Sequence, residues 1–287
     1  MTDVVPVRGR PARRPLEPSP FTYLFYPILA AAVLMPLGWA LLGGFKNPNE
    51  LFTYPPTLWP RHWTIANYVD VFVRLEFGRY LINTVVVALF TVVLTLFFAG
   101  LAAYALSRWD FRYKDVLLVT LLGLQLIPST VNIVPYYTIM NHLGLLNTRT
   151  ALVLIYTASH IPLAIWVLKG FFDTVPRALD EAAQIDGCSK WHTYWSIIVP
   201  LSLPGLSVAG FLVFVTSWSE FLVPLVIASA KDVAVTSVGL FTFFGPDAQT
   251  SYVYLFAATV ITVAPVVVAY LFAQRFLISG LTAFSDK

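Results

Sequence analysis

The sequence places a few polar side chains inside long apolar runs, where they could hydrogen-bond a polar ligand. Glu220 carries an ionisable group, and Ser217 and Trp218 stand just before it. Gln125 and Asn132 stand on either side of Pro128 in another apolar run. A polar group in apolar surroundings is costly unless it finds a partner, so these positions are candidates for a binding site.

Each candidate also has a structural interpretation. Glu220 could serve as the partner of a donor on a neighbouring helix instead of binding a ligand. Gln125, Ser129 and Asn132 could satisfy backbone groups that Pro128 leaves without partners. Trp218 could stack on a ligand or simply pack against other side chains.

The residue types of covalent and metal chemistry are too scattered to form a site. The sequence has one cysteine, Cys188, and four histidines that lie far apart along the chain. This pattern predicts neither a disulfide framework nor a metal site. A phosphate-binding loop of the form G-x4-G-K-S/T is also absent, so we do not expect this chain to bind ATP in the usual way.

The composition indicates that the solvent of this chain is a lipid bilayer. Hydrophobic residues make up 58% and charged residues only 11% of the 287 residues, whereas soluble domains carry about 25% charged residues. The mean hydropathy is +0.74. The small net charge of +3 comes from basic residues beside apolar runs, which suits lipid headgroups and argues against nucleic-acid binding.

Long apolar runs predict an all-α, polytopic protein with six transmembrane helices. We place the spans at about 22–44, 80–106, 115–139, 151–172, 200–228 and 251–277. Most Lys and Arg residues then fall on the side of the N-terminus, which predicts that the tails 1–21 and 278–287 are both cytoplasmic. Small residues in the second span, Ala99, Gly100, Ala102 and Ala103, permit close helix packing, including packing against another subunit.

The longest cytoplasmic segment between spans, 173–199, predicts a helix, a turn and a second helix. Pro176 suits a first helical turn, and Gly187 can end the first helix or allow close approach. Aromatic residues at helical spacing from Trp191 onward suit the membrane interface before Pro200. On the residues alone, a solvated connecting loop remains an alternative.

The same segment resembles the EAA motif of binding-protein-dependent ABC importer permeases. The match consists of Glu181-Ala182-Ala183, then Gly187, then Ile197-Ile198-Val199-Pro200, with Val199 in the place of Leu. Further runs resemble the carbohydrate-uptake branch, of the maltose-permease G-subunit type. These runs are Asn83-Thr84, Tyr104-Ala105-Leu106-Ser107-Arg108, Leu143-Gly144-Leu145-Leu146-Asn147-Thr148, Trp218-Ser219-Glu220-Phe221-Leu222 and Gly280-Leu281-Thr282-Ala283.

The resemblance implies a type I permease fold in the cytoplasmic membrane of a prokaryote. It implies that Glu181, Ala182, Ala183, Asp186 and Gly187 couple the chain to a separate ABC ATPase dimer. ATP and Mg would be bound by that dimer, and this chain would be a non-catalytic subunit without a cofactor. It further implies a second, different permease subunit and an extracytoplasmic sugar-binding protein, which the external segment 229–250 would enter.

Two other classes of function compete with an importer permease. An ion-coupled secondary transporter more often shows an inverted internal repeat and paired discontinuous helices, neither of which we find in this sequence. A membrane-embedded enzyme would need a cluster of ionisable residues, whereas Glu220 stands alone. Within the importer family a carbohydrate or related polyol is the expected cargo, with Trp218 a possible stacking surface for a sugar; glycerol phosphate or another small solute is the alternative.

Overall fold

The computed structural model describes residues 20–244 and 248–285, and these residues form helices and loops without a strand. Four helices are long and apolar enough to cross a bilayer by themselves. They are α1 (Pro20–Gly44), α4 (Phe77–Arg108), α7 (Arg149–Phe172) and α14 (Ala248–Ser285). Two bent pairs of helices raise the number of candidate spans to six if each pair is one span. The predicted all-α membrane fold is therefore confirmed.

The first bent pair covers the span that we predicted over 115–139 and is broken at Pro128. Helix α5 (Lys114–Leu124) stops short, and the chain restarts as a turn of 3-10 helix, η2 (Ser129–Asn132), followed by α6 (Ile133–His142). The two parts meet at 87°. Pro128 explains the break, because it has no N–H to donate and its backbone is extended, with ψ 134°.

The second bent pair lies at the start of the predicted span 200–228, where the sequence predicts a separate helix before Pro200. The first part of this pair comprises α9 (Lys190–Thr193), the π-helical turn η3 (Tyr194–Ile198) and α10 (Val199–Leu201), and it meets α11 (Leu203–Ser219) at 80°. At its other end α11 stops before Glu220, whose backbone is extended. The remaining apolar residues form a separate short helix, α12 (Leu222–Ile227).

The core is built around α4 and α7, with α11 packed against both. Small residues of α4 make this possible: Ala99 and Ala103 are fully buried beside Leu168, and a Cβ on Gly100 would come within 2.4 Å of the Tyr194 hydroxyl. The small residues that could have marked a subunit interface therefore include three that pack inside the chain.

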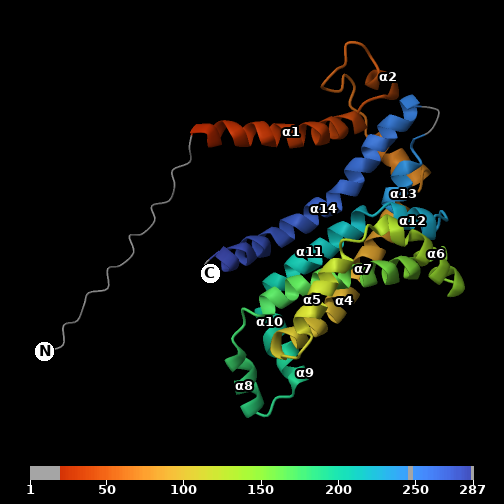
Figure 1. Ribbon diagram of the computed structural model, residues 1–287. Helices are drawn as coiled ribbons and strands as arrows, with labels where there is room; N and C mark the ends of the chain where they lie inside the picture. The colour runs from red at the N-terminus through yellow and green to blue at the C-terminus, as the bar shows by residue number, and fades with distance from the viewer. Residues whose placement is uncertain (1–19, 245–247, 286–287) are drawn as a thin grey trace.

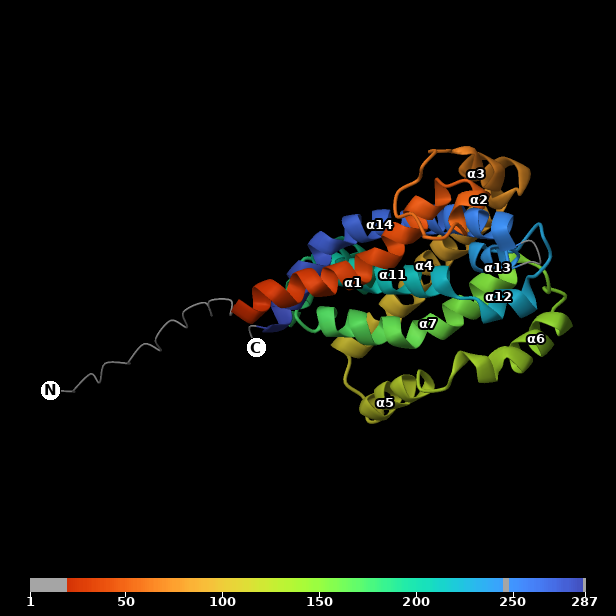
Figure 2. The same cartoon turned by 90° about the horizontal axis from the view of Figure 1, so that it is seen from above.

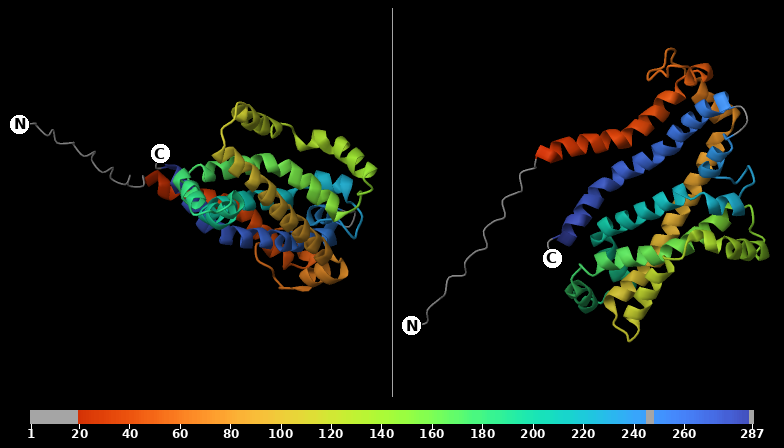
Figure 3. Two further views of the ribbon diagram at one scale, coloured as in Figure 1. Left: turned by 90° about the horizontal axis from the view of Figure 1, so that it is seen from below. Right: turned by 45° about the horizontal axis from the view of Figure 1, so that its top comes forward.

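The outer helices lie on opposite flanks of this core. Figure 2 shows α14 on one side of α11 and α7, and α5 and α6 on the other side; α1, which packs against α14, crosses in front of α11 in this view. The same separation is visible in the two views of Figure 3. Much of α1 is exposed within the chain, as the 75% exposure of Met35 illustrates, so lipid or another subunit must cover it.

The two ends of the bundle carry different polar segments. At one end are α2 (Pro48–Leu51), α3 (Ala66–Val69), the turn η1 (Asp70–Arg74) and α13 (Thr236–Phe241). Helix α8 (Arg177–Ile185) projects at the opposite end, as Figure 1 shows. This arrangement separates the predicted external segments from the predicted coupling segment.

Candidate functional site

The segment 173–199 forms a helix (α8), a turn and a second helix that begins with α9, as the sequence predicts. Both ends of α8 are well defined. Pro176 precedes the helix as its N-cap residue instead of occupying the first turn. Gly187 has a positive φ of 79°, and the N–H of Cys188 donates to the carbonyl oxygen of Ala183 at 2.9 Å. These are features of a Schellman-type helix end, which favours glycine. The Ser189 side chain then accepts from the N–H of His192 and caps α9.

A buried ion pair fastens α8 to the end of α4. The Nε of Arg108 lies 2.8 Å from Oδ2 of Asp180, with side chains only 7% and 10% exposed. The Tyr104 hydroxyl donates to the other carboxylate oxygen at 2.8 Å. Arg108 also donates to the carbonyl oxygens of Phe172 and Val175, at 3.0 and 3.2 Å. A single guanidinium thus joins α4, the end of α7 and α8.

The predicted coupling residues divide between two faces of this segment. Glu181, Ala182, Asp186 and Gly187 are exposed, whereas Ala183 is buried against the rest of the chain. The small side chain of Ala183 therefore packs within this chain, and of the two alanines only Ala182 lies on the outer surface. The outer face also carries Ile185, which is 87% exposed.

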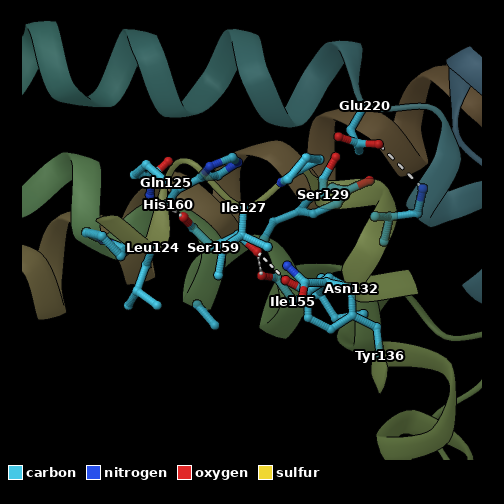
Figure 4. Close-up of a pocket in the computed structure, with 15 residues that line it drawn as sticks. Leu124, Gln125, Ile127, Ser129, Asn132, Tyr136, Ile155, Ser159, His160 and Glu220 are labelled. Carbon is cyan, nitrogen blue, oxygen red and sulfur yellow. Dashed lines mark hydrogen bonds between the residues drawn. The ribbon is translucent and has the colours of Figure 1, made fainter. Parts of the chain in front are cut away.

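A cavity of about 480 Å³ lies where the broken span α5–η2–α6 faces α7 and the end of α11. Figure 4 shows polar side chains from these elements around it, including Gln125, Asn132 and Glu220. The breaks at Pro128 and Glu220 place these three predicted residues together, although they are distant in sequence. Ser129, which we weighed with them, lines the same cavity.

Glu220 has a structural role as well as a place in this cavity. Its Oε1 accepts from the N–H groups of Leu222 and Val223 at 3.1 and 3.4 Å, at the start of α12. The hydroxyl of Ser237 donates to the Glu220 carbonyl oxygen at 2.6 Å. A carboxylate is favoured at a helix N-terminus because unpaired N–H groups point toward it.

Ser217 and Trp218 are not among the residues that line this cavity. Trp218 is 5% exposed, and its indole N–H donates to the carbonyl oxygen of Thr262 in α14 at 3.2 Å. The Trp218 side chain points toward α14, and Ser217 is buried elsewhere in the chain. The structure therefore gives Trp218 the packing role that the sequence left open.

Three polar cavity residues on α7 were not identified from the sequence as site residues. Tyr156, Ser159 and His160 all line the cavity. Gln125 donates to the Ser159 carbonyl oxygen at 3.0 Å, and the hydroxyls of Tyr136 and Ser159 lie 3.1 Å apart. His160 lies 3.3 Å from the Thr216 hydroxyl. The spacing i, i+3, i+4 puts all three on one helix face, and this signal could have revealed them.

At the other end of the bundle, α4 and the loop before α7 hold the connection between α12 and α13. The Asn83 amide donates to the carbonyl oxygens of Asp232 and Ala234 at 3.0 and 2.8 Å. Asn147 accepts from the Ala230 N–H at 3.1 Å. The first part of the predicted external segment 229–250 is thus fixed on two sides, while residues 245–247 lie outside the described part of the chain.

Among the residues that the structure describes, no group of three or more His, Cys, Asp or Glu side chains could hold a metal ion. The surface ion pairs include i,i+4 pairs such as Lys114–Asp110 and contacts between distant residues such as Arg177–Asp110. Hydrogen bonding to Lys114, together with the charges of Lys114 and Arg177, lowers the pKa of Asp110 in the loop between α4 and α5.

Comparison with known proteins gives relatives over nearly the whole chain. The probable ABC transporter permease protein YurM of Bacillus subtilis is 33% identical over 99% of this chain and 93% of its own length. The sulfoquinovosyl glycerol permease protein SmoH of Agrobacterium fabrum is 35% identical over 92% and 93%. The trehalose/maltose permease protein MalG of Thermococcus litoralis is 33% identical over 91% and 94%.

A solved structure supports the fold. A bacterial ABC transporter that imports the acidic polysaccharide alginate contains a chain that matches with a TM-score of 0.78 and 21% identity, over 90% of this chain and 95% of that chain. The family model described as binding-protein-dependent transport system inner membrane component matches residues 80–282. This match, which includes the helix α8 and its glycine turn, shows that the chain belongs to the family of inner membrane components of binding-protein-dependent transport systems.

Proposed function

We propose that this chain is a permease subunit of an ABC importer for a carbohydrate or a related polyol. An extracytoplasmic binding protein delivers the cargo, and a separate ATPase dimer binds ATP and Mg and supplies the energy. A second, different permease subunit completes the pathway, and this chain itself is non-catalytic. Relatives named for sulfoquinovosyl glycerol and for trehalose and maltose support a glycoside cargo.

The observation that carries this proposal is the attachment of α8. The helix projects beyond the bundle, and its exposed face includes Glu181 and Ile185. Its inner face is tied to α4 by the Arg108–Asp180 ion pair. An exposed apolar residue on a firmly held helix suits a groove on a partner protein. Because α8 is fixed to α4, a movement of the partner would move α4 as well.

In this mechanism the ATPase dimer closes on ATP and displaces α8. The buried ion pair transmits the displacement to α4 and, through the Arg108 bonds to Phe172 and Val175, to the end of α7. These two helices form the centre of the fold, so their movement changes which side of the membrane the pathway faces. Docking of α8 on the ATPase places both chain termini in the cytoplasm.

Reconstitution of the whole importer in proteoliposomes tests this function. The loaded binding protein should stimulate ATP hydrolysis, and the cargo should accumulate only when ATP is supplied on the side of α8. Accumulation that follows an ion gradient and needs no ATP would contradict the proposal and would favour a secondary transporter.

A further inference from the structure

The charged residues that line the cavity indicate whether it would bind a neutral or an anionic solute. We infer that the cavity between α5–η2–α6, α7 and Glu220 is a binding site for an uncharged polyhydroxylated solute. This inference rests on the proposed importer function and narrows its cargo. It excludes glycerol phosphate, uronates and sulfonated sugars as the solute that occupies this site.

The residues that line the cavity can both donate and accept hydrogen bonds. Gln125 and Asn132 carry amides that donate and accept, and Ser129, Tyr136 and Ser159 carry hydroxyls that can do the same. A sugar hydroxyl is also both a donor and an acceptor. Apolar residues, among them Ile127 and Ile155, cover the rest of the wall. The volume of about 480 Å³ lies in the range of small-molecule sites.

The lining contains a carboxylate and, among the described residues, no Lys or Arg. Glu220 can accept hydrogen bonds from solute hydroxyls with Oε2, because its bonds to α12 use Oε1. An anionic solute would be repelled by this carboxylate in surroundings of low dielectric constant. Sites for phosphate, sulfonate or carboxylate groups usually supply Arg or Lys to pair with the charge.

Tyr156 gives an independent sign of a missing ligand. The residue is 4% exposed and lines the cavity. Its hydroxyl is buried and has no hydrogen-bond partner among the residues that the structure describes. Buried polar groups are nearly always paired. Protein atoms cover this hydroxyl, so it gains a partner from a bound solute when the adjoining wall shifts to admit one.

The first test identifies the cargo by its charge. The importer's own binding protein is titrated with neutral compounds, namely maltose, trehalose, glucitol and glycerol, and with glycerol 3-phosphate, galacturonate and sulfoquinovose. Thermal stabilisation identifies its ligand, and ATPase stimulation in the reconstituted complex confirms delivery. We expect a neutral ligand. Stimulation by an anionic ligand only, with ATP-driven uptake, would leave the importer function standing and overturn the neutral site.

The second test uses Tyr156→Phe, with Tyr137→Phe as the matched control, because Tyr137 lies on α6 and is not a lining residue. Tyr156→Phe removes a hydroxyl that has no partner, so the purified complex should be as heat-stable as the wild type or more so. The KM for uptake of the neutral cargo should rise about fivefold, the effect of one lost hydrogen bond. Tyr137→Phe should leave KM unchanged.

Asn132→Ala provides a second cavity variant, and it should also raise KM while the loaded binding protein still stimulates ATP hydrolysis. If Tyr156→Phe and Asn132→Ala both leave KM at the wild-type value, the cavity does not bind the cargo and the inference fails. A complex that does not respond to its loaded binding protein at all would instead refute the proposed importer function, and this inference with it.

Discussion

Arg108 and Asp180 meet at 2.8 Å with almost no access to solvent, although they are separated by the whole of α5, α6 and α7. The pair joins the last residue of α4 to the helix that projects from the bundle. Separating the two side chains would leave a buried charge without a partner, so the contact holds α8 in a fixed orientation.

Asp180→Asn should therefore detach α8 from the bundle. Removing one partner of a buried ion pair costs about 3–5 kcal/mol, and the complex should unfold at a lower temperature. Stimulation of ATP hydrolysis should fall with it. Lys169→Ala is the control, because its partner Asp173 is 40% exposed, and loss of a surface pair costs about 1 kcal/mol or less. Equal stability of Asp180→Asn and the wild type would refute the anchoring role.

Gly187→Val should impair coupling of the chain to the ATPase because Val strains the backbone at this position, and not because its side chain clashes with other residues of the chain. Gly187 has φ 79°, and a Cβ there would have no neighbour within 4 Å. A β-branched residue with positive φ costs on the order of 1–2 kcal/mol. Gly187→Asn is the matched variant, since Asn tolerates this conformation. ATPase stimulation should be lost with Val and largely kept with Asn. If ATPase stimulation is lost equally in both variants, position 187 must lack a side chain for coupling, and its positive φ is not the reason for the glycine.

Glu220→Gln and Glu220→Ala separate the capping role from the charge. Gln keeps an oxygen that can accept from Leu222 and Val223, whereas Ala leaves the start of α12 without its acceptor. The Ala variant should lose about 1 kcal/mol of stability and most of its uptake, while Gln should keep much of both. Equal and complete loss of uptake in two well-assembled variants would show that the negative charge itself is essential.

The orientation of the chain can be tested with its single cysteine. Cys188 follows the α8 turn and is half-buried, so a membrane-impermeant maleimide should label it only after the cells are permeabilised. A Tyr54→Cys variant, at a position that is 96% exposed in the opposite end of the chain, should be labelled in intact cells. Labelling of Cys188 in intact cells would reverse the orientation and place α8 outside.

The sequence predicted the features that depend on neighbouring residues. Six apolar runs predicted the helices, because a bilayer requires long continuous segments with internal hydrogen bonds. Gly187 predicted the end of α8 because few other residues adopt a positive φ readily. These signals are local, and the structure reproduces the first, second and fourth predicted spans to within about three residues at each end.

The features that depend on distant residues could not be predicted in the same way. Hydropathy treats 115–139 and 200–228 as continuous, because it is averaged over a window in which apolar neighbours outweigh polar residues such as Ser129 and Glu220. Pro128 indicated that the helix could break there, but the angle of the break depends on packing against α7. Likewise, Asp180 has the signature of a residue at a helix N-terminus, and only the fold reveals that Arg108 lies beside it.

The central claim is that the outer face of α8 contacts the ATPase subunit. A photo-crosslinking amino acid at Ile185, which is 87% exposed, tests this contact directly in the assembled importer. The same amino acid at Val134, which is 73% exposed on α6, is the control. The account predicts an ATPase adduct from position 185 and none from position 134. An active importer in which position 185 yields no ATPase adduct would contradict it.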